Sequence, residues 1–322
     1  MQILKTIYSS LVNNMNNMKS AYFLFSSFFI RLIIIYAFGA SSYLFTKILG
    51  PSLTGFFCDD NSIKLPYHDS TIRIGVLVTI IYILLFLTIW IVELICHNVY
   101  YSKTSSQEPI LKLGNVIIHP IVPRALEIFV ISQLGCMITI FLFNLSKYAG
   151  GRLRPNFVAT CQPDRWENCK PGDFIQDYEC LGKNKHNADE SRFSFYSGHT
   201  AESFYYVVFL ILYIHAKIGR KFCFSILLPI LYVLLISGAF YVGCSRIWDH
   251  KHHPSDVFFG GFMGIATAVI LVYYYRGVFF DINDDFIVRQ DSEGSITKAP
   301  ITVEKTGEPV IVIGDKLLQV KK

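Results

Sequence analysis

Three short stretches of this chain contain residues whose types and spacing suit chemistry on a phosphoryl group. They supply cations that can clamp phosphoryl oxygens, a histidine that can attack phosphorus and a second histidine that can protonate the departing oxygen. Each stretch borders a long apolar segment, which suggests a site at the edge of a membrane. The predicted site residues are Lys147, Arg154, Ser197, Gly198, His199, Ser245, Arg246, His252 and Asp256.

The first stretch pairs Lys147 with Arg154, seven residues further along. Arginine offers a planar fork of donors and lysine a compact charge, and phosphate recognition favours such a pair. Gly150, Gly151 and Pro155 indicate that a helix does not continue through this stretch. Taken alone, the pair is also typical of basic side chains that extend toward the membrane interface.

The second stretch, Ser197-Gly198-His199, opens an apolar segment. A serine and a glycine can cap a helix, and the free N–H groups of a first helical turn form a natural anion site. His199 would face a bound phosphate there and protonate a leaving alkoxide. The alternative is a plain helix cap with an interfacial histidine.

The third stretch contains Ser245, Arg246, His252 and Asp256. His252 and Asp256 are four residues apart, so in a helix they would share one face, where Asp256 could accept the N–H of His252. The other ring nitrogen would then be the nucleophile, while Arg246 and Ser245 donate to the phosphoryl oxygens. The alternative is a surface loop leading into a helix whose N-terminal dipole Asp256 complements.

The neighbours His250 and His253 raise the question of a metal site. A metal-dependent phosphatase would cluster two or more carboxylates around divalent ions. The stretches offer Asp249 and Asp256 but no acidic cluster, and cations already surround the predicted phosphate position. The sequence therefore predicts a metal-independent reaction without a cofactor.

The composition indicates that membrane-spanning helices position these residues. The chain is 52% hydrophobic and only 16% charged, whereas soluble domains are about 25% charged. We expect an all-α membrane protein with a domain over residues 21–276, flanked by unstructured tails at 1–20 and 277–322. No Lys/Arg-rich run supports nucleic-acid binding. The six predicted spans are residues 21–46, 74–96, 124–147, 199–216, 222–243 and 257–275.

Charges in the short connections predict the orientation of these spans. The turn at 216–222 contains Lys217, Arg220 and Lys221, and the positive-inside rule places it, with both termini, in the cytosol. The loop at 147–198 has eight Lys/Arg residues and opposes this count, but it is long. The predicted catalytic loops, 147–199 and 244–256, then share the non-cytosolic side.

Cysteines and intramembrane charges add further expectations. Four loop cysteines allow three disulfide pairings in an oxidising compartment, which the sequence does not separate. Among ionisable residues in the spans, Glu93, Glu127 and His215 are expected to be solvated at the interface, whereas Arg31 has no evident role. The loop cysteines are Cys58, Cys161, Cys169 and Cys180.

Together the three stretches resemble the signature of the type 2 phosphatidic acid phosphatase superfamily, which also includes vanadium haloperoxidases. The surroundings resemble its lipid phosphate phosphatase branch, over roughly residues 50–275. The segments that carry this resemblance are residues 55–60 (GFFCDD), 62–64 (SIK), 151–155 (GRLRP), 161–164 (CQPD) and 251–253 (KHH). Tyr196 stands where the wider superfamily often has proline, and the catalytic loop lacks the branch's usual glycosylation sequon.

The resemblance implies a six-span phosphatidate phosphatase, expected in the plasma membrane, with an extracellular or lumenal site. Lys147, Arg154 and Arg246 would bind phosphate with help from Ser197, Gly198 and Ser245. His252 would form a phosphohistidine supported by Asp256, and His199 would protonate the lipid alcohol and later activate water. The implied substrates are phosphatidate, lysophosphatidate, sphingosine 1-phosphate and ceramide 1-phosphate in the outer or lumenal leaflet of the bilayer.

Other functions remain alternatives at this stage. Within enzymes, they are a relative acting on a soluble phosphate ester and a lipid phosphotransferase. A non-catalytic scaffold that binds lipid phosphates would usually lack the nucleophile or a clamp residue, and both are present here. A transporter would be expected to show paired broken helices at mid-membrane. The sequence leaves the oligomeric state open, with a homo-oligomer among the options.

Overall fold

The computed structural model describes residues 2–50, 54–98, 111–113, 116–219 and 226–279, together with short strands between 287 and 319. The chain divides into two compact units, Met1–Tyr274 and Tyr275–Lys322. The first unit contains every predicted site residue.

Six helices of the first unit are long and apolar enough to cross a membrane, which confirms the predicted all-α membrane fold. The six helices are α1 (Gln2–Leu49), α2 (Ile74–Cys96), α3 (Ile121–Gly150), α6 (Gly198–Ile218), α7 (Leu227–Trp248) and α8 (Pro254–Tyr274). The fifth span was predicted to end at residue 243, but α7 continues to Trp248 because no proline or glycine interrupts it there. Ser245 and Arg246 are therefore helical rather than loop residues.

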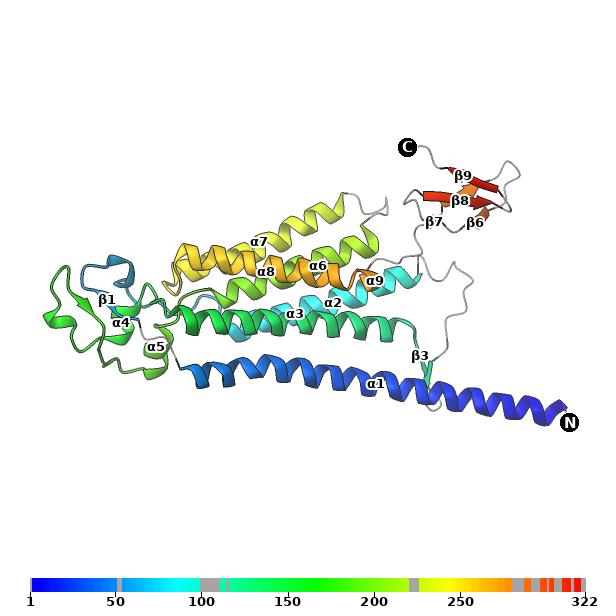
Figure 1. Ribbon diagram of the computed structural model, residues 1–322, viewed down its shortest axis with the longest axis horizontal. Helices are drawn as coiled ribbons and strands as arrows, with labels where there is room; N and C mark the ends of the chain where they lie inside the picture. Colours follow the sequence, from blue (N-terminus) through cyan, green and yellow to red (C-terminus); the bar gives the residue numbers. More distant parts are fainter. Residues whose placement is uncertain are drawn as a thin grey trace. The chain divides into compact units, whose positions relative to one another are not determined.

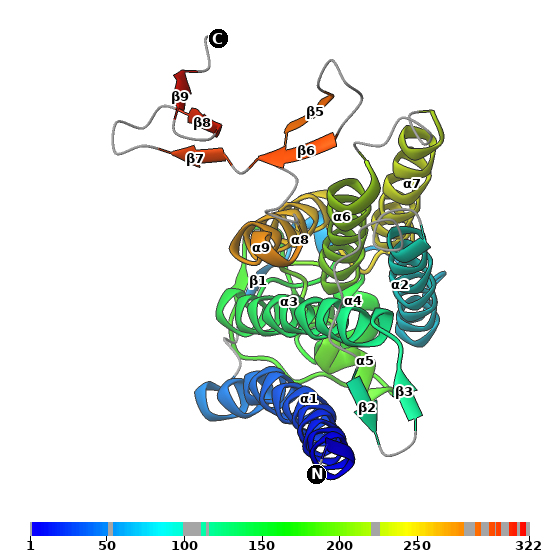
Figure 2. The same ribbon diagram turned by 90° about the vertical axis from the view of Figure 1, so that its right-hand side faces the viewer.

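Helix α6 lies at the centre of this unit. It packs against α2, α3, α7 and α8, while α1 packs against α3 (Figure 2). The contact with α8 is close because Gly260 and Gly264 present no side chain to α6. A Cβ on Gly260 would lie 2.6 Å from the carbonyl oxygen of Ser197, and one on Gly264 would collide with the carbonyl of Ala201. Small residues spaced four apart are a common way for membrane helices to approach closely.

A small cap joins the helices at the end where α2 begins and α3 ends (Figure 1). Strand β1 (Phe56–Phe57) pairs antiparallel with β4 (Phe174–Ile175), over a core that includes Leu153 and Phe157. The remaining cap elements are η1 (Asn61–Ile63), α4 (Phe157–Cys161), η3 (Trp166–Asn168) and α5 (Lys185–Glu190).

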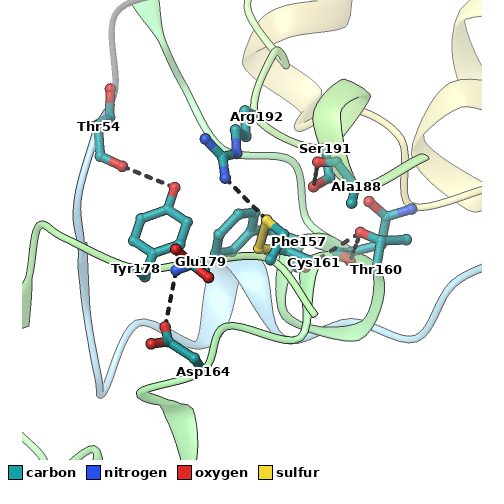
Figure 3. Close-up of a disulfide and its surroundings, with 12 residues drawn as sticks. Thr54, Phe157, Thr160, Cys161, Asp164, Tyr178, Glu179, Ala188, Ser191 and Arg192 are labelled. Carbon is teal, nitrogen blue, oxygen red and sulfur yellow. Dashed lines mark hydrogen bonds between the residues drawn. A yellow bond between two sulfur atoms is a disulfide. The ribbon is translucent and has the colours of Figure 1, made fainter. Parts of the chain in front are cut away.

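Two disulfides close the cap and select one of the three pairings that the sequence left open. Cys58 is bonded to Cys169, and Cys161 to Cys180. The first bond ties the α1–α2 connection to the α3–α6 connection. The second lies beside Arg192, and nearby the hydroxyl of Tyr178 donates to the carbonyl of Thr54 (Figure 3). The cap therefore forms one covalently braced unit above the helix ends.

Arg31, Glu93 and Glu127 have partners within the protein, which corrects the expectation of interfacial solvation for the two glutamates, whereas His215 is exposed. Arg31 of α1 makes two hydrogen bonds to Glu127 of α3, at 2.9 and 2.7 Å, and so gains the role that the sequence did not reveal. Glu93 of α2 is buried, accepts a hydrogen bond from the Tyr213 hydroxyl and lies 3.4 Å from Arg124. Burial in an apolar medium favours such pairing over an isolated charge.

The termini differ from the unstructured tails that the composition favours. Helix α1 begins at Gln2, and residues 2–20 contain no proline or glycine to interrupt it. The second unit contains α9 (Arg276–Phe279) and five short strands that form antiparallel sheets, rich in the β-branched residues Val and Ile. These strands are β5 (Ile287–Gln290), β6 (Ile296–Ala299), β7 (Ile301–Val303), β8 (Pro309–Ile313) and β9 (Lys316–Gln319).

At the end of the helices opposite the cap, β2 (Leu111–Leu113) pairs with β3 (Val116–Ile118). The basic residues Arg220 and Lys221, which the orientation argument used, lie outside the described residues, as do Lys103 and Cys223.

Candidate active site

All nine predicted site residues lie at the cap end of the helices. Lys147 is in the last turn of α3, and His199 follows the N-cap Ser197 at the start of α6. Arg246 is in the last turn of α7, and Asp256 is in the first turn of α8. Because these helices alternate in direction, two C-terminal ends and two N-terminal ends meet beneath the cap (Figure 1).

The chain between α3 and α6 folds back on itself to place Arg154 and Ser194. Helix α3 ends where Gly151 adopts a left-handed backbone, with φ of 52°, a conformation that glycine adopts at no steric cost. Beyond it, the Arg154 amide donates to the Ser191 carbonyl at 2.8 Å, and the Ser194 amide to the Arg152 carbonyl at 2.7 Å. This pairing holds Ser194 next to the α8 N-terminus.

His252 is buried, and its ring is held by the backbone. Its Nδ1 lies 2.7 Å from the Ser194 carbonyl oxygen. A carbonyl only accepts, so Nδ1 carries the proton and Nε2 keeps its lone pair. Burial, together with the charges of Arg154 and Lys147, lowers the pKa of His252 well below its ordinary value. The ring is therefore neutral at physiological pH, as a nucleophile requires.

The predicted hydrogen bond between His252 and Asp256 is not formed, since Nδ1 and Oδ2 are 4.0 Å apart. The prediction assumed a helix through both residues, but α8 begins at Pro254, so His252 precedes it. Asp256 instead accepts from the Ser194 hydroxyl at 2.6 Å, from the His253 amide at 2.9 Å and from the Arg152 guanidinium at 2.6 Å. Its link to His252 therefore runs through Ser194.

His199 lies in the first turn of α6, and the backbone of Ile72 lies beside its side chain. Its Nε2 is buried and has no hydrogen-bond partner among the residues that the structure describes. The α6 N-terminus is fixed by the Ser197 amide, which donates to the Asp256 carbonyl at 3.2 Å, and by Thr200, whose hydroxyl donates to the Ser197 Oγ. Both His199 and His252 lie at the cap end of the helices, and the charges of Lys147 and Arg154 act on both rings.

The cations of the site are of two kinds: arginines that are paired with a carboxylate, and lysines that lie over an aromatic ring. Arg154 donates to Glu190 at 3.1 Å, and Arg246 donates to Asp249 at 2.7 Å. Lys147 lies over the Phe143 ring at 5.0 Å from its centroid. Lys251, which is buried, lies 3.8 Å from the ring centroid of a tyrosine, Tyr67. Within the described parts of the chain, neither lysine forms a salt bridge with a carboxylate.

Ser245 does not play the part that the sequence suggested. Its hydroxyl donates to the Val242 carbonyl of the same helix at 2.7 Å and accepts from the Arg246 guanidinium at 3.1 and 3.2 Å. A helical serine commonly turns its hydroxyl toward a preceding carbonyl in this way. Ser245 therefore orients Arg246 instead of offering its own proton to a ligand.

Three further residues contribute that the motifs did not mark. Ser194 joins His252 to Asp256, and Lys251 adds a fourth cation near Arg154 and Arg246. Asp249 holds Arg246 and also accepts from the amide and hydroxyl of Thr71, at 2.9 and 2.6 Å, which anchors the first cap segment. Lys251 directly precedes His252, and Asp249 lies three residues before it. This closeness in sequence to a predicted site residue could have indicated both of them.

Comparison with known proteins shows the family to which the chain belongs. The PAP2 superfamily matches residues 129–279. Phospholipid phosphatase 2 of Bos taurus is 34% identical over 73% of this chain and 78% of its own length, and phospholipid phosphatase 1 of Mus musculus is 37% identical over 72% and 78%. The chain belongs to the lipid phosphate phosphatase family. No solved structure matches it.

As a member of this family the protein is a multi-pass integral membrane phosphatase that acts on lipid phosphates. The matched segment contains Lys147, Arg154 and both histidines, so the family match and the geometric site coincide.

Proposed function

We propose that this phosphatase hydrolyses lipid phosphate monoesters in two steps through a phosphohistidine at His252. The observation that carries the proposal is the protonation state and environment of the His252 ring. Its Nδ1 proton is committed to the Ser194 carbonyl, its ring is neutral, and cations surround it. A neutral imidazole beside a cationic phosphate clamp is a competent nucleophile toward phosphorus.

In the first step, Nε2 of His252 forms a bond to phosphorus while the bond between phosphorus and the lipid oxygen breaks. The departing alkoxide takes the Nε2 proton of protonated His199, whose charged form the bound phosphate dianion favours and whose buried Nε2 has no other partner among the described residues. In the second step, His199 removes a proton from water, and the resulting hydroxide attacks phosphorus. The bond to His252 breaks and inorganic phosphate leaves.

The cations supply the electrostatic part of the reaction. A phosphate monoester is largely dianionic at neutral pH, with a second pKa of about 6. Glu190 and Asp249 each pair with one arginine, so the remaining charges of Lys147 and Lys251 match that dianion. We therefore add Lys251 to Lys147, Arg154, Arg246 and the α6 N-terminus, with Ser197 and Gly198, as the phosphate-binding set.

The proposed substrates are phosphatidate, lysophosphatidate, sphingosine 1-phosphate and ceramide 1-phosphate. Two disulfides brace the cap beside the site, and disulfides persist in oxidising compartments. This supports a site on the extracellular or lumenal side, with plasma membrane as the proposed location and substrates in the facing leaflet. The domain proposal remains one phosphatase domain over residues 21–276 with cytosolic termini.

The test is to trap the phosphoenzyme. Purified protein is mixed with radiolabelled phosphatidate, denatured at alkaline pH because phosphohistidine is acid-labile, and examined for label. The wild type should carry label and release phosphate in the presence of EDTA, whereas His252→Asn should do neither. Label retained by His252→Asn, with normal turnover, would refute the assignment.

A second arm isolates His199. An aryl phosphate has a leaving group that needs no protonation, so His199→Asn should still form the phosphoenzyme from it. Hydrolysis of that intermediate still needs a base, so label should accumulate above the wild-type level. Equal labelling of both proteins, with equal turnover, would remove His199 from the second step.

A further inference from the structure

An apolar cavity of about 350 Å³ lies between α2, α6 and α7. Its lining runs from Ile72 to Leu84 on the α2 side and includes Leu210 on α6 and Val242 on α7. The helical part of this lining, from Val76 to Leu84 on α2, rises by about 12 Å. That length approaches half of a bilayer's hydrocarbon thickness of about 30 Å. The cavity thus extends from the site end of the helices toward the middle of the membrane.

The cavity begins directly at the catalytic histidine of α6. The backbone of Ile72, a residue that lines the cavity, lies beside the side chain of His199. Ser203, another lining residue, lies one turn after His199, and its hydroxyl donates to the His199 carbonyl at 2.7 Å. A group that leaves phosphorus beside His199 therefore stands at the mouth of the cavity.

We propose that this cavity, the α2–α6–α7 groove, binds a hydrocarbon chain of the lipid phosphate and selects substrates by chain length. The proposal rests on the proposed function, because His199 must lie beside the leaving lipid oxygen. From that oxygen only a few atoms separate the phosphate from the first methylene groups. A chain continuing along the helix axes toward the bilayer centre follows the direction of the groove.

The groove acts through shape more than through hydrophobic energy. Lipid tails are as apolar as the groove walls, so moving a chain from bilayer to groove gains little from leaving water. What the groove supplies is a fixed chain direction, which orients the phosphate toward His252. Its influence should therefore appear as a preference between substrates that share a headgroup and differ in their chains.

Gly238 on α7 offers a way to fill the groove. It is a lining residue, and a Cβ built on it meets no atom within 4 Å, so larger side chains enter open space. Gly75 on α2 is a matched control, because a Cβ there also meets no atom within 4 Å and Gly75 does not line the groove. Both glycines belong to helices, so the two substitutions make similar demands on the backbone.

The experiment measures kcat/KM for dioleoyl and dihexanoyl phosphatidate in mixed micelles. Gly238→Phe should lower the ratio of the dioleoyl to the dihexanoyl value by about tenfold or more, as expected when a pocket loses space for part of a substrate. Gly238→Ala should lower this ratio less, and Gly75→Phe should leave it at the wild-type value. Activity on the short-chain lipid shows that each variant is folded, and Gly238→Leu replaces the phenylalanine variant if that one does not accumulate.

The proposal would be overturned if Gly238→Phe lowered kcat/KM equally for both lipids, or did not lower it for the dioleoyl lipid. A changed oligomeric state with an unchanged chain preference would also overturn it, and would assign the groove to a helix of a second copy. The mechanism is tested separately by phosphoenzyme trapping. Hydrolysis without a phosphohistidine would refute the mechanism and leave the chain-length comparison valid.

Discussion

Charged side chains occur at both ends of the helices, and they differ in their partners. Away from the cap, Arg31 is joined to Glu127, and Arg124 lies beside Glu93. At the cap end, Arg154 and Arg246 also have carboxylates, but Lys147 and Lys251 pack over aromatic rings and form no salt bridge among the described residues.

This difference separates structural charge from functional charge. An ion pair that is complete within the protein satisfies both members and stabilises the contact between two helices. A buried cation without a carboxylate is costly unless an anion arrives from outside. Lys251 is buried and Lys147 is partly buried, and we propose that these two lysines mark the phosphate-binding position.

The largest effect is expected from removing an unpaired cation. Lys147→Gln should lower kcat/KM for phosphatidate by about a hundredfold to a thousandfold, since each preorganised charge on the transferring group carries several kcal/mol. The measurement is phosphate release from membranes containing equal amounts of each protein. Lys185→Gln, which changes an exposed lysine of the same cap, should behave as the wild type. Wild-type activity in Lys147→Gln would remove the lysine from the clamp.

A smaller effect is expected from the link between Asp256 and His252. Ser194→Ala removes the hydroxyl that donates to Asp256 but keeps the carbonyl that holds His252. Loss of one hydrogen bond to a charged group should lower kcat about tenfold or somewhat more and leave KM nearly unchanged. Ser191→Ala is the matched control, because that buried hydroxyl bonds only a local carbonyl, that of Ala188. Equal effects of the two variants would make Ser194 merely structural.

How far the sequence predicts this molecule depends on the kind of contact. Residue types and spacing predicted the cations and both histidines of the candidate site, because such chemistry needs particular side chains. The partner of His252 escaped prediction because it is a backbone carbonyl, which no residue type marks. The partner of Arg31 escaped because Glu127 is 96 residues away, and only helix packing brings the two together.

The same reasoning covers the fold. The six spans follow from apolar length, which is local information, and they agree closely with the structure. Disulfide pairing instead depends on how the cap folds over residues 58–180, so the sequence did not distinguish the three possible pairings. The end of α7 was misplaced because residues 244–248 are less apolar, although nothing there stops a helix.

Activity is expected to change only a few-fold when Lys251 loses its proton at alkaline pH. Burial, and then the nearby charges of Arg154 and Arg246, lower its pKa to about 8, against the opposing effect of Glu190 and Asp249. The ammonium is charged below that pH and neutral above it, so phosphate binding should weaken as pH rises through about 8. Lys251→Arg keeps the charge and should raise the ratio of activity at alkaline pH to activity at neutral pH. An unchanged ratio would place the alkaline loss on another group.

The smallest effect on catalysis, and the sharpest contrast with Lys147, is expected at Arg31. Arg31→Leu leaves Glu127 without its partner and should lower stability by about 1 kcal/mol, the usual scale for polar contacts between membrane helices. Phosphate release per folded molecule should stay at the wild-type value, because Arg31 lies in α1 and its guanidinium is bound to Glu127 of α3. The double variant Arg31→Leu/Glu127→Leu should recover the lost thermal stability, since replacing both members of a pair removes the orphaned charge. If Arg31→Leu instead reduced turnover without changing the melting temperature, partnered and unpartnered cations would not differ in role, and the reading of the two lysines as the phosphate site would lose its basis.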